Sequence, residues 1–300
     1  MRRLDNIDLR LLRVFMTLVE AGGFSGAQIA LNLSQSTLST HLADLEKRLG
    51  GQLCIRGRKT FRLTDLGQAT YEAAVRLFID VENFGHRVAA AKGRLTGRLR
   101  LGIVDGVITS KELGLQHTLD RLMQPEIDVV IDVIQATPLE LEKAVTEGRR
   151  DAVIGPFSQQ APGIVYRPLY RELNELYCGK GHPLFEHPDE LINQADIERA
   201  NLSVRAYRQL DDLYRIGHSK ASGSVHQMEA QAMLILSGHF IGFLPRHMAE
   251  IWLNVGQMRA IKPGRFGFHS QHFLAFRQSE QDRPVIRALL AAIGNPSHQP

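Results

Sequence analysis

The segments FSGAQIALNLSQSTLSTHLADLEKRLG at residues 24–50 and LCIRGRKTFRLTDLG at 53–67 carry the clearest local signals in this 300-residue chain. They predict a short helix over about 25–31, with Ser25 as its N-cap, and then a tight turn. Ser34 is expected to cap a second helix, with Thr37 at its N3 position. Gly50-Gly51 would end that helix, and residues 52–64 read as a hairpin.

The second helix has two different faces. Its apolar stripe is spaced 4-3-4 and consists of Leu38, Leu42, Leu45 and Leu49. Small polar residues and Gln35 occupy the first turns, mostly off that stripe. A capped helix of this kind can enter the DNA major groove with its N-terminal residues against base edges.

The polar helix and the basic hairpin together predict a winged helix-turn-helix. A Gln amide can pair bidentately with adenine, and Ser or Thr can bond to either base type. Basic residues of the hairpin can lie over phosphates. The candidate DNA contacts are Ser25, Ser34, Gln35, Ser36, Thr37, Ser39, Thr40, Arg56, Arg58, Lys59 and Arg62. Alternatively, the polar residues are only solvated helix surface.

These segments resemble the LysR-type transcriptional regulators, whose pattern runs F-T-x-A-A-x-x-L, S-Q-S-x-L-S-x-x-I-x-x-L-E, L-F-x-R and L-T-x-x-G. The matching residues are Phe24, Ala27, Leu31, Ser34, Gln35, Ser36, Leu38, Ser39, Leu45, Glu46, Leu49, Gly50, Leu53, Arg56, Leu63, Thr64 and Gly67. Three positions depart from the pattern: Gln28 replaces the usual second Ala, Thr40 a commonly basic residue, and Cys54 the usual Phe.

The resemblance covers the whole chain and implies its organisation. It implies a winged helix-turn-helix domain at 1–65, a dimerising linker helix at 66–93 and an effector-binding domain at 94–300. That domain would have two lobes like a periplasmic binding protein: lobe 1 at about 98–160 and 269–300, and lobe 2 at about 161–268. It also implies a cytoplasmic bacterial regulator that binds double-stranded operator DNA as a homodimer, often as a homotetramer.

Apolar spacing supports this organisation independently. Residues 9, 12, 15, 16 and 19 form one face of a first helix. A long helix follows over about 66–91, with the stripe Ala73, Leu77, Val81, Phe84, Val88 and Ala91. That stripe could pack on its own domain or on a second copy of itself.

Strands and helices alternate beyond residue 97, as expected for an α/β domain. Strands are predicted at 98–104, 128–134 and 151–155, with helices between them at about 110–123 and 139–147. Later strands are expected near 164–169, 175–178, 201–205 and 272–277, and helices near 189–194, 208–215 and 284–293. A further helix leads into a strand within 224–245.

Ligands of open α/β sheets bind beyond the carboxyl ends of the strands, where helix N-termini supply free N–H groups. The candidate effector residues there are Asp105, Thr109, Ser110, Thr137, Ser203, Arg205 and His226. Hydroxyl groups and an Arg suit a small carboxylate, whereas Asp105 would repel an anion or pair with Arg205 or an amine. The alternative is that the hydroxyl groups only cap helices and that His226 is a surface residue.

Charge is concentrated in the first third of the chain. Residues 1–97 hold 14 basic and 9 acidic residues, and residues 98–300 hold 22 and 23. A basic head on a near-neutral remainder suggests that only the head meets a polyanion, although a solvated basic surface would look the same.

Other classes of protein find little support in the sequence. Two cysteines, Cys54 and Cys178, cannot make a disulfide framework or a four-cysteine zinc site. The apolar N-terminal stretch is interrupted by Asp8, Arg10 and Arg13, which favours an amphipathic helix over a signal peptide. Catalytic, phosphate-binding and metal-binding motifs are absent, so we expect no enzyme, cofactor or metal. The competing hypothesis is a solute-binding or enzymatic α/β protein with an incidental helical head.

Overall fold

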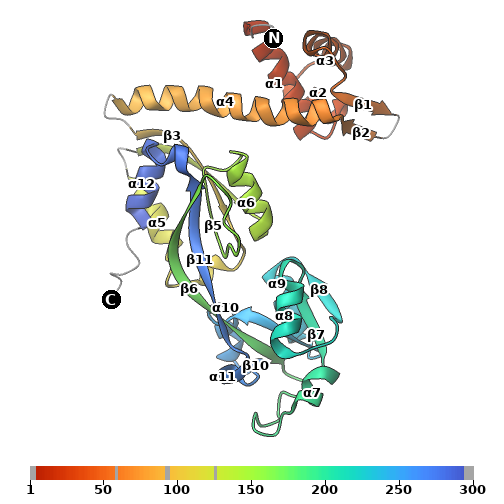
Figure 1. Cartoon of the computed structure of the whole chain (residues 1–300), viewed down its shortest axis with the longest axis vertical. Helices are drawn as coiled ribbons and strands as arrows, with labels where there is room; N and C mark the ends of the chain where they lie inside the picture. The colour runs from red at the N-terminus through yellow and green to blue at the C-terminus, as the bar shows by residue number, and fades with distance from the viewer. Residues whose placement is uncertain (1–4, 58–59, 92–94, 125–126, 294–300) are drawn as a thin grey trace. The chain divides into compact units, whose positions relative to one another are not determined.

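The computed structural model of the chain describes residues 5–57, 60–91, 95–124 and 127–293. They form two units, Met1–Val88 and Ala89–Pro300, which Figure 1 shows as a helical part and a part built on a sheet. The expected order of helical head, long helix and α/β remainder is confirmed.

Helix-capping residues define the elements of the N-terminal unit. Asp5 caps α1, because its carboxylate accepts the backbone N–H groups of Ile7 at 2.8 Å and Asp8 at 3.0 Å. Ser34 caps α3 as predicted, since the N–H of Thr37 donates to its Oγ at 3.2 Å. The predicted cap at Ser25 is wrong: α2 begins one residue earlier, and its N-cap is Gly23. The elements are α1 (Asn6–Glu20), α2 (Phe24–Leu31), α3 (Gln35–Leu49), β1 (Cys54–Gly57), β2 (Thr60–Leu63) and α4 (Asp65–Ala91).

One apolar core joins these helices to the β1–β2 hairpin. It is built from fully buried residues such as Phe15, Leu18, Leu38, Leu42 and Leu53. The hairpin is pinned at its base, where the Thr64 hydroxyl donates to the Gln52 carbonyl at 2.6 Å. A Cβ at Gly67 would lie 1.8 Å from the Leu53 carbonyl oxygen, so only glycine permits this close approach.

The second unit is built on a mixed nine-stranded sheet of the described residues, in the order β4-β3-β5-β11-β6-β9-β7-β8, with β10 paired to β6. Strands β3 (Leu95–Ile103), β4 (Ile127–Gln135) and β5 (Ala152–Gly155) are parallel neighbours, as predicted for βαβ units. Helices α5 (Leu115–Leu122) and α12 (Pro284–Ile293) lie on one side of these strands, and α6 (Pro138–Thr146) lies on the other (Figure 1). The predicted helix at 110–123 is shorter, because a 3-10 turn, η1 (Val107–Thr109), comes first.

Two long antiparallel strands, β6 (Ile164–Gly179) and β11 (Phe268–Arg277), run from one half of this unit to the other (Figure 1). The prediction of two short strands at 164–169 and 175–178 is therefore wrong, because a single 16-residue strand covers both. The far half contains β7 (Asn201–Arg205), β8 (Gly223–Val225), β9 (Phe240–Pro245), β10 (Met258–Ala260), the turn η2 (Ala206–Arg208), α7 (Gln194–Arg199), α8 (Gln209–Ile216), α9 (Met228–Leu236), α10 (Arg246–Leu253) and α11 (Pro263–Phe266). Another 3-10 turn, η3 (Gln278–Glu280), follows β11.

Each half has its own apolar core, so we call the halves lobe 1 and lobe 2. The core of lobe 1 forms around β3, β5 and α12, with Leu101, Ile154 and Ile286 fully buried. The core of lobe 2 forms around β7 and β9, with Leu202 and Phe243 fully buried. Because β6 and β11 contribute buried residues to both cores, these strands form the crossover between the lobes.

Candidate functional sites

The first turns of α3 present polar side chains to solvent. Leu38, Leu42 and Leu45 are buried in the core of the helical unit, which turns Gln35 and Thr40 outward. The Thr40 hydroxyl donates to the Ser36 carbonyl of its own helix at 3.0 Å. Within the described residues, no partner bonds to the Gln35 amide. Gln35 thus offers a free amide donor and acceptor at the start of an exposed helix.

The remaining candidates on α2 and α3 divide by what they contact. Ser34 and Thr37 form the helix cap, and Ser34 Oγ lies 2.8 Å from both Ser36 Oγ and Thr37 Oγ1. Ser25 is exposed in the first turn of α2, and Ser39 is half-buried on α3. Ser34 and Thr37 therefore fix the start of α3, beside the free amide of Gln35.

The hairpin places basic residues next to these helices in the sequence. Arg62 is exposed on β2. Arg56 lies on β1 opposite Phe61 in the strand register. Arg58 and Lys59, predicted at the hairpin tip, lie outside the described residues.

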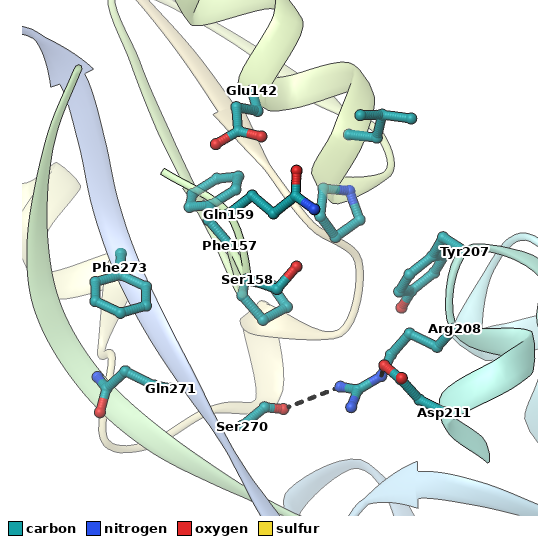
Figure 2. Close-up of a pocket in the computed structure, with 13 residues that line it drawn as sticks. Glu142, Phe157, Ser158, Gln159, Tyr207, Arg208, Asp211, Ser270, Gln271 and Phe273 are labelled. Carbon is teal, nitrogen blue, oxygen red and sulfur yellow. Dashed lines mark hydrogen bonds and ion pairs between the residues drawn. The ribbon is translucent and has the colours of Figure 1, made fainter. Parts of the chain in front are cut away.

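The second candidate site is a cavity of about 580 Å³ between the two lobes. Figure 2 shows side chains of lobe 1, lobe 2 and the crossover converging on it. Its lining residues are Pro138, Leu139, Glu142, Pro156, Phe157, Ser158, Gln159, Tyr207, Arg208, Asp211, Ser270, Gln271 and Phe273. Pro156 follows β5 and Tyr207 follows β7, so the cavity lies at carboxyl ends of parallel strands, as predicted for the ligand site.

Arg208 is the cation of this cavity. Its Nη1 donates to the Ser270 hydroxyl at 3.4 Å, a contact drawn in Figure 2. Its Nε is buried without a hydrogen-bond partner among the described residues, and the Asp211 carboxylate is 3.8 Å away. Burial, and then the neighbouring charge of Arg205, lower the pKa of Arg208. A guanidinium stays charged even so. An anionic group in the cavity would be attracted to that charge.

Glu142 is the anion on the lobe 1 side of the cavity. The Tyr166 hydroxyl donates to its Oε1. Burial, followed by this hydrogen bond, raises the pKa of Tyr166 to about 12, so the phenol keeps its proton at neutral pH. The cavity therefore carries the Glu142 carboxylate on one wall, and the Arg208 guanidinium with the neighbouring Asp211 carboxylate on the other (Figure 2).

None of the seven candidate effector residues lines the cavity. Arg205 and Ser203 are buried inside lobe 2: Arg205 donates to Asp212 Oδ1 at 3.3 Å, and Ser203 to the Ile241 carbonyl at 3.1 Å. Thr137 caps α6 in a capping box with Glu140.

The other four candidates lie on the remaining elements around the crossover. Asp105 accepts the backbone N–H of Met228 in lobe 2. Thr109 contacts His247, and the Ser110 hydroxyl accepts the backbone N–H of Leu113 at 3.2 Å. His226 is exposed.

The sequence contained a usable signal for the cavity residues that were missed. Residues 156–159 directly follow the strand at 151–155, and Arg208 follows Arg205 by one turn. Applying the strand-end rule to every strand would have selected both segments. Glu142 and Gln271 gave no such signal, because they lie inside a helix and a strand.

Membrane and metal sites find no support in the part of the chain that the structure describes. None of its helices combines the length and apolar character that a bilayer crossing requires. The described residues also contain no group of three or more potential metal ligands.

Comparison with known families decides the class of protein. Residues 92–295 match the LysR substrate binding domain, and residues 9–68 match the bacterial regulatory helix-turn-helix protein of the lysR family. The chain belongs to the LysR family. This LysR-family chain is 36% identical over 292 residues to the HTH-type transcriptional activator BauR of Pseudomonas aeruginosa, covering 97% of this chain and 96% of the relative. It is therefore a transcriptional regulator with a DNA-binding domain and an effector domain.

Solved LysR regulators share its fold. Full-length CbnR complexed with its target DNA superposes with a TM-score of 0.66 at 21% identity, over 95% of this chain and 98% of that one. LysG from Corynebacterium glutamicum, with its bound effector Arg, superposes with a TM-score of 0.56 at 17% identity, over 95% and 96%. At these identities the likeness supports the fold, and the contacts of this regulator follow from its own residues.

Proposed function

We propose that this regulator reads its operator with the first turns of α3 and binds phosphates with the hairpin. The free Gln35 amide and the exposed Thr40 supply base contacts, and Arg56, Arg58, Lys59 and Arg62 supply charge. Ser25, Ser34, Ser36, Thr37 and Ser39 supply hydroxyl groups for the cap or for DNA. Such a regulator acts on DNA in the bacterial cytoplasm.

The working form is a homodimer joined through α4, and two dimers can form the tetramer that the family resemblance implies. The first half of α4 packs on its own unit through residues such as Ala74 and Phe78. Its second half exposes Val81, Phe84 and Val88 at fractions of 49%, 71% and 46%. These three share one face with Ala73 and Leu77, and a second copy of the helix would cover that face.

The effector of this regulator is a small carboxylate held by Arg208 in the cavity between the lobes. The observation that carries this assignment is that Arg208 lines the cavity, with its Nη1 near Ser270 and its Nε 3.8 Å from Asp211. Arg205, the guanidinium expected from the sequence, is 1% exposed, does not line the cavity, and has Asp212 and Asn174 as partners. Glu142 on the other wall disfavours a second negative group and favours a cationic one.

Fluorescence anisotropy of the full-length protein tests this function. The labelled probe is the DNA immediately upstream of its own gene, compared with a shuffled probe, with and without a panel of small carboxylates. We expect tighter binding to the upstream probe, changed by at least one carboxylate. Amino-carboxylates should act at lower concentration than dicarboxylates of similar size, and Glu142→Gln should remove that preference.

Variants separate the effector site from general damage. Arg208→Gln should raise the half-effective concentration of the carboxylate about tenfold or more, because a hydrogen bond to a charged group is lost. Lys220→Gln removes an exposed charge of lobe 2 outside the cavity and should change nothing. Equal, weak binding of both DNA probes would contradict the operator assignment. An unchanged carboxylate response in Arg208→Gln would contradict the effector assignment.

A further inference from the structure

The crossover between the lobes contains buried titratable groups that neither DNA binding nor the effector cavity uses. Glu172 on β6 is 4% exposed and His272 on β11 is 1% exposed. In the strand register, Ser270 lies opposite Glu172, and His272 lies opposite Tyr170, on which its ring stacks at 4.6 Å. Glu172 is thus a carboxylate buried at the crossover.

His247 connects this carboxylate to lobe 1. It lies in the first turn of α10 in lobe 2, and its Nε2 is 3.1 Å from Glu172 Oε1. Its Nδ1 is 2.7 Å from Thr109 Oγ1, which belongs to η1 of lobe 1. The imidazole of His247, which belongs to lobe 2, therefore contacts both lobe 1 and the crossover.

The number of protons on this imidazole decides where the Thr109 hydroxyl donates. The Thr109 hydroxyl has one proton and donates to the Gly106 carbonyl at 3.0 Å. If it does so, the Nδ1 contact needs a proton from His247, while Glu172 can only accept at Nε2. Only a doubly protonated imidazole places a proton in all three contacts.

The groups around Glu172 favour its ionised form. Burial opposes ionisation of Glu172, yet the hydrogen bond from His247 and the charges of both histidines hold the pKa of Glu172 below its ordinary value. Burial lowers the pKa of His272, and the charge of Glu172 opposes that shift. His247 Nε2, at 3.1 Å, is the nearer of the two imidazoles to this carboxylate.

The other charged groups of this region lie on the elements around His247. They are Asp105 before η1, Lys111 and Glu112 after it, Arg246 and Glu250 on α10, Tyr170 and Glu175 on β6, and Arg205 and Arg208 at the end of β7 and in η2. Lys111 lies 3.8 Å from Glu250, and Arg246 lies 3.8 Å from Glu175. The two opposite charges of each pair therefore offset one another.

We propose that His247 is a proton-dependent tie between the two lobes. In its protonated form it holds Thr109 of lobe 1 and Glu172 of the crossover together. Loss of the proton as the pH rises removes the ion pair and one hydrogen bond, which loosens lobe 1 from α10. The balance of lobe arrangements, and with it the output of the regulator, then responds to pH. The tie is independent of the effector, so its failure would leave the proposed effector site untouched.

The fluorescence of a tryptophan on α10 can report on the contact between His247 and Thr109. Trp252 is the only Trp in the sequence, lies on α10, and lines a surface groove together with Thr109. We would record its emission in the full-length protein from pH 5.5 to 8.5, with neither DNA nor effector. The wild type should show a single-proton transition, and His247→Gln should abolish it. His226→Gln, which removes an exposed His of lobe 2, should retain it, with far-UV circular dichroism confirming that each variant is folded.

A second variant keeps the test decisive if His247→Gln does not fold. Thr109→Val removes the hydroxyl that accepts from the protonated ring, together with its bond to the Gly106 carbonyl. The transition should therefore move to lower pH by about half a unit to one unit. A transition that persists in His247→Gln, a wild type without any transition, or an unmoved midpoint in Thr109→Val would each overturn the proposal.

Discussion

Two arginines one turn apart show how the surroundings of a residue decide its role. Arg205 is 1% exposed and shares a buried ion pair with Asp212, which is 0% exposed. Burial opposes the charge of Arg205, but Asp212, together with Tyr207 and Glu172, raises the pKa of Arg205 above its ordinary value. Arg208 lines the cavity, where its Nη1 donates to Ser270. The sequence predicted Arg205 among its candidate effector residues, because it could not show which arginine lines the cavity.

Asp212→Ala tests the buried pair. Removing the carboxylate leaves Arg205 as an uncompensated buried charge, and we expect a loss of about 3–5 kcal/mol in the free energy of unfolding. Urea unfolding at neutral pH, followed by Trp252 emission in the same lobe, measures it. Asp211→Ala is the matched control, because that carboxylate is 67% exposed. It should stay within about 0.5 kcal/mol of the wild type. Equal losses in both variants would refute a special role of the buried pair.

At the scale of elements, local signals predicted those elements whose ends are set by their own residues. Helix α3 begins after Ser34 and ends at the Gly50 region, as expected. The three parallel strands of lobe 1 were predicted directly from their apolar runs. Strand β6 was predicted as two pieces, because Arg171, Glu172 and Asn174 interrupt its apolar pattern. Glu172 and Asn174 are buried only because lobe contacts and polar partners from distant segments surround them. Such partners are not visible in a local pattern.

Helix α1 shows a smaller failure of the same kind. The predicted face included Leu9, Met16 and Val19, whereas the structure buries Leu11, Val14 and Leu18 more completely. The core around α1 receives side chains from several elements, so the buried face is wider than a single stripe.

The exposed end of α4 makes a prediction about assembly. Phe84→Glu places a charge at the centre of the proposed helix–helix contact, and the dimer should weaken at least about 30-fold, as expected for a buried aromatic at an interface. Sedimentation equilibrium of the full chain measures the dissociation constant. Phe84→Leu keeps the apolar contact and should remain close to the wild type. Because Phe84 is 71% exposed within one chain, its loss should not unfold the monomer. A dimer that survives Phe84→Glu would place the interface elsewhere.

At the scale of the whole molecule, the sequence predicted the class of function better than the residues that line the cavity between the lobes. Recognition residues lie within one continuous segment, 24–67, so their order and spacing are visible in the sequence. The cavity combines residues from 138 to 273, drawn from both lobes and the crossover. Only the folded sheet brings Glu142, Arg208 and Gln271 to one cavity. Strand-end reasoning therefore selected the edge of the sheet where this cavity lies, but not the residues that line it.

The uneven charge of the molecule gives a last prediction. Residues 1–97 carry an excess of five basic residues and the remainder an excess of one acidic residue, so counterion release on DNA should come from the head alone. Each phosphate contact contributes about 0.9 to the slope of log affinity against log salt. In the proposed dimer, Arg62→Gln removes two contacts and should lower that slope by about two, while weakening operator and shuffled DNA alike. Lys220→Gln in lobe 2 should leave the slope unchanged. If Arg62→Gln instead weakened only the operator complex at constant slope, the wing would read bases and not phosphates.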